Sequence, residues 1–123
     1  MNWRRAADRI AADAHGRRGE EEAARWLAAQ GFALLARRVK TPRGEVDLIA
    51  RGEGLVVFVE VKWRARAGDL AQAIDQRRLA RVAAAAEVLA PHYVKPGEDM
   101  RIDVLLLAPG HDPHHIANAW MPL

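Results

Sequence analysis

Two charged residues, Glu60 and Lys62, interrupt the most apolar run of the sequence, which reads Leu-Val-Val-Phe-Val-Glu-Val-Lys over residues 55–62. Side chains along a strand alternate between its two faces, so Glu60 and Lys62 point to the same face. The preceding segment carries Glu45 and Asp47 and is separated from this run by a turn that contains glycine. Carboxylates gathered beside an ammonium group are suited to binding a divalent cation.

The length of that turn decides whether these charges meet. Period-two alternation puts residues 45, 47 and 49 on one face of their strand. A turn of even length brings both sets of charges to one face of the hairpin, whereas an odd length sends them to opposite faces. We expect the even turn, with the pairs Ala50–Leu55, Asp47–Phe58 and Glu45–Glu60.

Neighbouring carboxylates need a compensating charge, because two of them about 5 Å apart repel by roughly 3 kcal/mol at an effective dielectric of about 20. A Mg²⁺ or Mn²⁺ ion would supply that charge, since a hard cation accepts a few carboxylate oxygens and keeps several waters. The alternative is a buried ion pair between Glu60 and Lys62. That alternative leaves Asp47 unexplained, so the residues favour a metal-binding hairpin.

A further acid comes from residues 19–30, which predict a helix that ends at Gly31. The apolar stripe of this helix comprises Ala23, Ala24 and Leu27. Glu20 precedes these residues by three, four and seven positions, so it points toward the core and can reach the hairpin. The alternative is that the acids of the first turn only complement the positive end of the helix dipole.

A second helix is predicted from an N-cap at Asp69 to about Ala90, where Pro91 closes it. Its apolar stripe comprises Leu79, Ala83, Ala86 and Ala90. Continued backward at helical spacing, this stripe reaches Gln76 and then Gln72, so two amides are expected to face the sheet. The alternative is an amide at the helix rim that bonds a loop.

The remaining segments predict structural elements. Residues 32–39 favour a strand that leads into a Pro-Arg-Gly turn, and residues 102–107 favour a strand buried on both faces. Asp103 interrupts the second strand, where we expect a salt bridge with Arg101 or another arginine rather than catalysis. The histidine-rich stretch 111–115 contains an Asp-Pro step typical of a turn. Metal binding there is disfavoured, because no second cluster of ligands occurs elsewhere.

The order of these motifs resembles the YraN-like proteins, an uncharacterised bacterial family related to archaeal Holliday-junction resolvases. The resemblance runs from about Arg17 to Trp120 and rests on Gly-Glu at 19–20, Gly-Glu-Val-Asp-Leu-Ile-Ala at 44–50, Val-Phe-Val-Glu-Val-Lys at 57–62, Arg-Ile-Asp-Val at 101–104 and His-Ile-Ala-Asn-Ala-Trp at 115–120. It implies a restriction-endonuclease-like fold and the PD-(D/E)xK nuclease signature, whose acids and lysine would be Asp47, Glu60 and Lys62.

The resemblance also implies a mechanism, which is metal-assisted hydrolysis of a phosphodiester. Asp47, Glu60 and the carbonyl of Val61 would hold one or two Mg²⁺ or Mn²⁺ ions. Lys62 would orient or polarise the attacking water. The metal would stabilise the charge that develops on the phosphate, which is the main electrostatic task in this chemistry.

Three further residues receive supporting roles. Glu20 would complete a second metal position or hold a ligating water, with Glu45 as a reserve acid. A polar residue on the second helix approaches the metals in resolvase-like nucleases, which assigns Gln76 to the ligand shell or to a phosphate contact. The sequence departs from the family pattern at Val46, where the signature has proline, and at Trp63, where many relatives have threonine.

Length and charge agree with a nucleic-acid partner. The 123 residues suit one domain, the net charge is +3, the pI is about 9.9, and three of the nineteen basic residues are lysines. Arginine clusters would surround the acidic site and could follow phosphates; arginine-rich usage in a GC-rich genome is the alternative. We predict that nucleic acid contacts Arg43, Arg64, Arg66 and Arg77.

Several classes are excluded by composition. The absence of cysteine excludes disulfides, zinc–thiolate sites and thiol nucleophiles. No run approaches the roughly 18 apolar residues of a membrane span, and the N-terminus lacks an apolar signal core, so we expect a cytoplasmic protein with no membrane partner. We divide the chain into an N-terminal basic arm, residues 1–18, and a single endonuclease-like domain, residues 19–123.

These observations predict an α/β, restriction-endonuclease-like fold with a mixed central sheet of about five strands flanked by helices. The expected function is metal-dependent hydrolysis of phosphodiester bonds in structured or branched DNA, with RNA as the other substrate class. Two alternatives stay open: a non-catalytic nucleic-acid-binding protein of the same fold, and an interaction domain whose carboxylates brace the core. Resolvases make two symmetric cuts, so the resemblance implies a homodimer.

Overall fold

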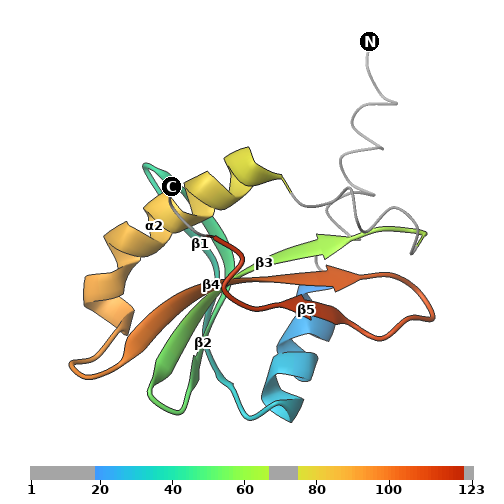
Figure 1. Cartoon of the computed structure of the whole chain (residues 1–123), viewed down its shortest axis with the longest axis horizontal. Helices are drawn as coiled ribbons and strands as arrows, with labels where there is room; N and C mark the ends of the chain where they lie inside the picture. Colours follow the sequence, from blue (N-terminus) through green and yellow to red (C-terminus); the bar gives the residue numbers. More distant parts are fainter. Residues whose placement is uncertain (1–18, 67–74, 121–123) are drawn as a thin grey trace.

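The chain folds around a central sheet with a helix on each face (Figure 1). This computed structural model describes residues 19–66 and 75–120. The predicted basic arm at residues 1–18, the predicted cap Asp69 and the amide of Gln72 lie outside the described residues.

In the described part of the chain, the sheet has five strands in the order β1-β2-β3-β4-β5. They are β1 (Ala33–Thr41), β2 (Gly44–Gly52), β3 (Leu55–Trp63), β4 (Asp99–Leu107) and β5 (His114–Ile116). The first three run antiparallel, β3 and β4 are parallel, and β5 returns antiparallel to β4. The predicted α/β architecture with a mixed sheet of about five strands is therefore confirmed.

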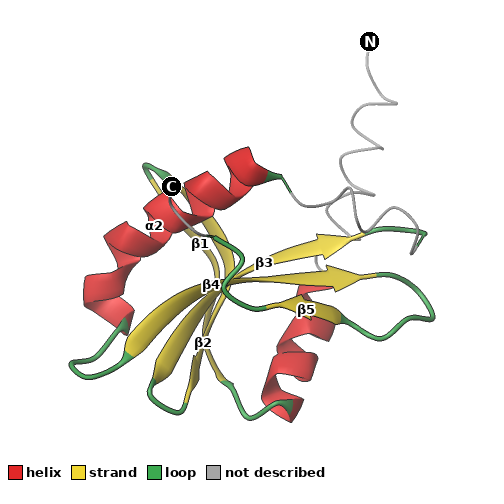
Figure 2. Cartoon of the chain, in the orientation of Figure 1, coloured by secondary structure: helices red, strands yellow, loops and turns green. Residues whose placement is uncertain are grey.

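The two helices of the described residues cover opposite faces of this sheet (Figure 2). The N-terminal helix occupies residues 19–29, and α2 spans Gln76–Tyr93. Alternate side chains of β3 point to opposite faces of the sheet, since Val57 packs with the N-terminal helix and Phe58 packs with α2. The predicted inner stripe of the N-terminal helix is buried, as shown by Ala23, Ala24 and Leu27. No helix among the described residues is long and apolar enough to cross a membrane.

The N-terminal end of α2 differs from the prediction. The helix that reaches Ala90 begins at Gln76 rather than after Asp69. Asp75 has an extended backbone, with φ −123° and ψ 117°, and its carboxylate accepts the Arg77 N–H at 2.9 Å. This side chain satisfies a donor that the first turn leaves unpaired, which is the reason for the helix start.

The C-terminal end of α2 also differs, because the helix continues past Pro91 to Tyr93. Proline removes one helical N–H, but the next turn still closes, with the Val94 N–H bonded to the Ala90 carbonyl at 2.8 Å. The Tyr93 carbonyl accepts a hydrogen bond from Arg51 on β2 at 2.6 Å. Tertiary contacts thus hold a last turn that proline by itself disfavours.

The hairpin between β2 and β3 has the even turn that convergence of the acids requires. Gly52 pairs with Leu55, so the turn consists of Glu53 and Gly54. Gly54 has φ +66°, a left-handed conformation that glycine adopts without steric cost. A turn this short lets β2 run two residues further than predicted, to Gly52, whereas β3 begins at Leu55 as predicted.

The register of the hairpin corrects the predicted partners. Leu48 and Val59 form the last pair between β2 and β3, which brings Asp47 level with Glu60 one step further on. The two acids are therefore neighbours across the hairpin. The predicted pairs are two residues out of register, namely Ala50–Leu55, Asp47–Phe58 and Glu45–Glu60.

Candidate functional site

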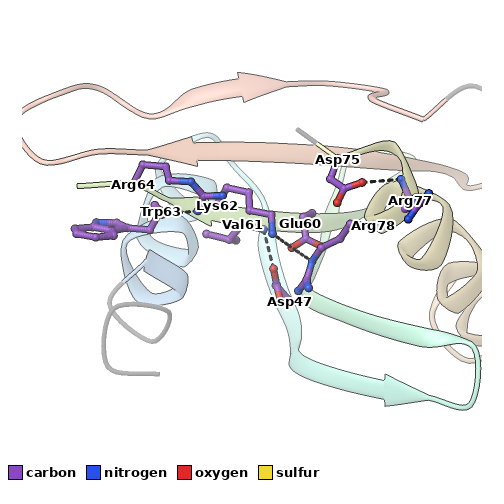
Figure 3. A network of polar contacts seen from close by, with 9 residues as sticks. All are labelled: Asp47, Glu60, Val61, Lys62, Trp63, Arg64, Asp75, Arg77 and Arg78. Carbon is purple, nitrogen blue, oxygen red and sulfur yellow. Dashed lines mark hydrogen bonds and ion pairs between the residues drawn. The ribbon is translucent and has the colours of Figure 1, made fainter. Parts of the chain in front are cut away.

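Asp47 lies where β2 separates from β3. Side-chain alternation breaks at this residue, since Val46 packs with α2, Leu48 with the N-terminal helix and Ile49 again with α2. The Asp47 Oδ2 atom accepts the main-chain N–H of Val61 at 2.8 Å (Figure 3). Strand N–H groups point toward the neighbouring strand, so this carboxylate stands in the sheet plane, in the place of a strand carbonyl. The predicted common face of residues 45, 47 and 49 is therefore wrong.

Glu60 supplies the second carboxylate from the α2 face of β3, and its side chain is 3% exposed. Arg78 of α2 donates from Nε to Oε1 at 2.9 Å, and the Lys62 Nζ atom lies 3.7 Å from the same oxygen (Figure 3). Oε2 is buried and has no hydrogen-bond partner within residues 19–66 and 75–120. A buried anionic oxygen without a donor is unfavourable, so it marks a place for a cation or a proton.

The two carboxylates are short of positive charge. Burial raises the pKa of Asp47 to about 7, and repulsion from Glu60 adds to this effect, while the Val61 N–H and Arg78 oppose it. Burial lowers the pKa of Arg78, but attraction to the surrounding carboxylates outweighs it and raises that pKa overall. The Arg78 guanidinium, with the more distant Lys62 ammonium, thus compensates the pair only in part.

Asp47 lines a cleft at the fork between β2 and β3. Its lining comes from both helices and three strands, through Glu20, Arg38, Glu45, Asp47, Val61, Trp63 and Arg78. Glu20 therefore lies in the same cleft as the hairpin acids, as its helical spacing predicts. Its Oε2 accepts a hydrogen bond from the Nε of Arg38 at 2.6 Å. Its catalytic role stays a prediction.

Arg38 reaches Glu20 from an unusual backbone conformation. Its φ is +49°, although it lies between regularly paired neighbours in β1. The left-handed region costs a residue with a side chain about 1–3 kcal/mol, and such strain recurs at functional sites. In the β1–β2 register Arg38 stands opposite Asp47, so both strands depart from regularity at the level of the site.

Arg78, not Gln76, is the α2 residue that reaches the acids. Gln76 is exposed at the first position of the helix, so its predicted orientation toward the sheet is wrong. The buried face of α2 consists of Leu79, Val82, Ala85, Ala86 and Leu89. It passes through Val82 rather than Ala83, because the larger side chain has more apolar area to bury. Arg78 precedes Val82 by one helical turn, which is the signal that could have identified it.

The predicted metal ligands form a small set. Within the described ranges, no group of three or more histidine, cysteine, aspartate or glutamate side chains could hold a metal ion. The set reduces to Asp47, Glu60 and the Val61 carbonyl. These residues fit Mg²⁺ or Mn²⁺, because Mg²⁺ is usually held by one or two carboxylates, several waters and substrate phosphates. The orphaned Oε2 of Glu60 is the atom that such an ion would satisfy.

The four arginines predicted to bind nucleic acid differ in exposure. Arg66 and Arg77 are exposed, and Arg43, also exposed, lies 3.7 Å from a carboxylate oxygen of Glu87. Arg64 is half-buried and donates from a terminal nitrogen to the carbonyl of its own neighbour in the chain at 2.9 Å. Their contacts with nucleic acid stay predictions.

A third buried acid, Asp103 on β4, is surrounded by hydrogen-bond donors. Arg101 donates two hydrogen bonds to it at 2.7 Å, the Asn118 N–H donates one at 3.0 Å, and the His115 Nε2 atom lies 2.7 Å away. The predicted salt bridge with Arg101 is confirmed. His115 also packs edge-on against Trp26, with ring centroids 5.1 Å apart. This histidine therefore belongs to a structural cluster.

The mixed sheet, the helix on each face and the acids at the fork of two strands define a protein of the restriction-endonuclease-like class. Within that class, the chain belongs to the uncharacterised protein family UPF0102, whose model matches residues 19–107. This is the YraN-like family that the sequence resembles.

Bacterial members of this family match almost the whole chain. It is 61% identical over 111 residues to a UPF0102 protein of Erythrobacter litoralis, covering 90% of this chain and 96% of that protein. It is 54% identical over 114 residues to one of Sphingopyxis alaskensis, covering 93% and 98% of the two chains. It is also 54% identical over 120 residues to one of Rhizorhabdus wittichii, covering 98% of each.

Proposed function

We propose that this protein is a metal-dependent nuclease that hydrolyses phosphodiester bonds in structured or branched DNA. The observation that supports this most directly is the buried Oε2 of Glu60, which lacks a donor in the described part of the chain and belongs to a carboxylate that interacts with Asp47. Two such anions are stabilised when a cation joins them. Asp47, Glu60 and the Val61 carbonyl would hold Mg²⁺ or Mn²⁺.

The reaction would break one P–O bond of the backbone and add the oxygen of water to phosphorus. The bound metal would polarise the phosphoryl oxygens and stabilise their developing charge. Lys62, whose Nζ lies 3.7 Å from Glu60 Oε1, would orient the attacking water. Glu20 would hold a second water or ligand at the cleft, with Glu45 as the reserve acid.

The arginines predicted to bind nucleic acid suit a polyanion. Arg43, Arg64, Arg66 and Arg77 would follow the phosphates of the substrate on either side of the cleaved bond. DNA is the proposed substrate, and RNA is the alternative nucleic acid. The relation to resolvases extends the proposal to a homodimer, because two symmetric cuts require two sites, and to action in the cytoplasm.

A cleavage assay tests this function. The full chain is incubated with Mg²⁺ or Mn²⁺ and labelled single-stranded, duplex, flap and four-way DNA, together with matched RNA. We expect cleavage of the branched DNA, reduced roughly 100-fold or more by Asp47→Asn and by Glu60→Gln. Glu53→Gln is the matched control, because it neutralises an exposed glutamate in the hairpin turn.

Cleavage that persists in both site variants would contradict the proposal. Salt-sensitive binding without cleavage would instead support a non-catalytic nucleic-acid-binding protein. One observation favours this second function, since the guanidinium of Arg78 already neutralises part of the charge on Glu60. If the protein neither binds nor cleaves nucleic acid, the remaining alternative is an interaction domain whose buried carboxylates stabilise the core.

A further inference from the structure

We propose that Arg78 exchanges between Glu60 and a phosphate group of the substrate, so that nucleic acid and the divalent cation load the site together. The inference rests on the proposed function and adds to it a phosphate-binding residue from outside the nuclease signature. It concerns a contact that the sequence did not predict.

Arg78 lies between a buried acid and the solvent. Its Nε donates to Oε1 of Glu60 at 2.9 Å, and its side chain is 47% exposed while that of Glu60 is 3% exposed. Among the described residues, Nε is the only nitrogen of this side chain with a hydrogen-bond acceptor. The two terminal amino groups of the guanidinium therefore remain for another acceptor.

The position of Arg78 suits a phosphate. It lines the cleft that contains Asp47, and it also lines a smaller cavity between β2 and α2, formed with Glu45 and Arg81. Figure 3 shows its side chain reaching from α2 toward the acids of the hairpin. A guanidinium presents its donors in a planar fork that matches two oxygens of a phosphate. The same side chain can therefore serve Glu60 or a substrate at the cleft.

When a divalent cation is bound at Glu60, charge makes these two contacts of Arg78 compete. A guanidinium and a divalent cation on one carboxylate repel, so Arg78 leaves Glu60 more readily when a metal is bound there. Conversely, Arg78 that binds a phosphate leaves Oε1 of Glu60 open. Because the protein ligands are few, the phosphate also completes the coordination. Each ligand should then raise the affinity for the other by the same factor.

The test measures Mn²⁺ affinity by calorimetry, for the full chain alone and bound to a four-way DNA whose phosphorothioate linkages resist hydrolysis. In the wild type we expect the DNA to tighten Mn²⁺ binding about 10-fold. Arg78→Ala and Arg78→Gln should each tighten Mn²⁺ binding several-fold without DNA, and should reduce the effect of DNA. Arg25→Ala removes an exposed arginine outside both cavities and should change neither quantity.

If Arg78 only stabilises Glu60 through their ion pair, the opposite result is expected. Unchanged or weaker Mn²⁺ binding in both Arg78 variants would overturn the exchange, even where metal-dependent cleavage is found. Tighter Mn²⁺ binding in both Arg78 variants, together with a smaller effect of DNA on that binding, would support the exchange even where no DNA is cut. In that case only the nuclease proposal fails. Absence of Mn²⁺ binding in the wild type, with and without DNA, would overturn both.

Discussion

Asp103 and Glu60 are both buried carboxylates on the adjacent parallel strands β4 and β3, one register step apart and on opposite faces of the sheet. Both oxygens of Asp103 accept hydrogen bonds, from Arg101 and from the Asn118 N–H. Glu60 has a donor on Oε1 and none, among the described residues, on Oε2. The same fold thus completes one acidic site and leaves the other incomplete.

The two regions also differ in the direction in which the pKa of their buried aspartate is shifted. Burial raises the pKa of Asp103, but hydrogen bonds from Arg101, the Asn118 N–H and His115 outweigh it, and the pKa is lowered overall. At Asp47, burial and repulsion from Glu60 outweigh the opposing effects of the Val61 N–H and Arg78, and the pKa rises to about 7. Burial of charge by itself is therefore no sign of function. The informative feature is a buried acid whose surroundings do not compensate it.

The largest expected effect is the loss of stability on Asp103→Ala. This change leaves the Arg101 guanidinium and the Asn118 N–H without their acceptor, and breaking such a buried pair costs about 3–5 kcal/mol. Urea unfolding at pH 8 measures it, with Asp47→Asn as the comparison. Equal losses in the two variants would break the distinction between a completed and an incomplete site.

Mn²⁺ should stabilise the protein through the incomplete site only. At 100 times its dissociation constant, a ligand that binds the folded state alone adds about 2.7 kcal/mol to the free energy of unfolding. Asp47→Asn and Glu60→Gln should abolish this gain, whereas His115→Gln should retain it. Thermal unfolding with and without Mn²⁺ is the measurement, and a gain that survives in both site variants would place the metal elsewhere.

The pH dependence of stability should sharpen the comparison. Because the pKa of Asp47 rises from 3.8 to about 7 on folding, its contribution is complete below pH 3.8 and is lost as the pH rises through 7. Asp47→Asn keeps an acceptor for Val61 but does not titrate. Its free energy of unfolding, relative to wild type, should increase by about 2.6 kcal/mol from pH 5 to pH 8, because almost two pH units of this range lie below the folded pKa and each corresponds to about 1.4 kcal/mol. Denaturant titrations across this range would contradict the assignment if the difference stayed constant.

The smallest expected effect is that of His115→Gln, at about 1 kcal/mol. Asp103 retains Arg101 and the Asn118 N–H in this variant, so the acid stays paired. Urea unfolding again provides the value. A loss as large as that of Asp103→Ala would mean that the cluster depends on the histidine and on its packing against Trp26.

Local patterns were enough to predict much of this fold. The apolar run at 55–62, the stripe of the N-terminal helix and the Arg101–Asp103 pair all depend on spacing within one element, which a sequence displays directly. The hairpin register was harder to predict, because it depends on the conformation of Gly54. Asp47 was harder still, since its in-plane position arises only where two strands separate.

The amino-acid sequence by itself determined that acids of two successive strands meet across a hairpin, because the strand pattern and an even turn are local properties. Which acid lies beside Glu60 depended on the register. Only the tertiary structure decided which positive group meets them. An alanine-rich helix can present several similar faces to a sheet, and the rotation of α2 is chosen by the packing of Val82 and Leu89 in the core. That rotation, and no motif in the sequence, brings Arg78 to Glu60.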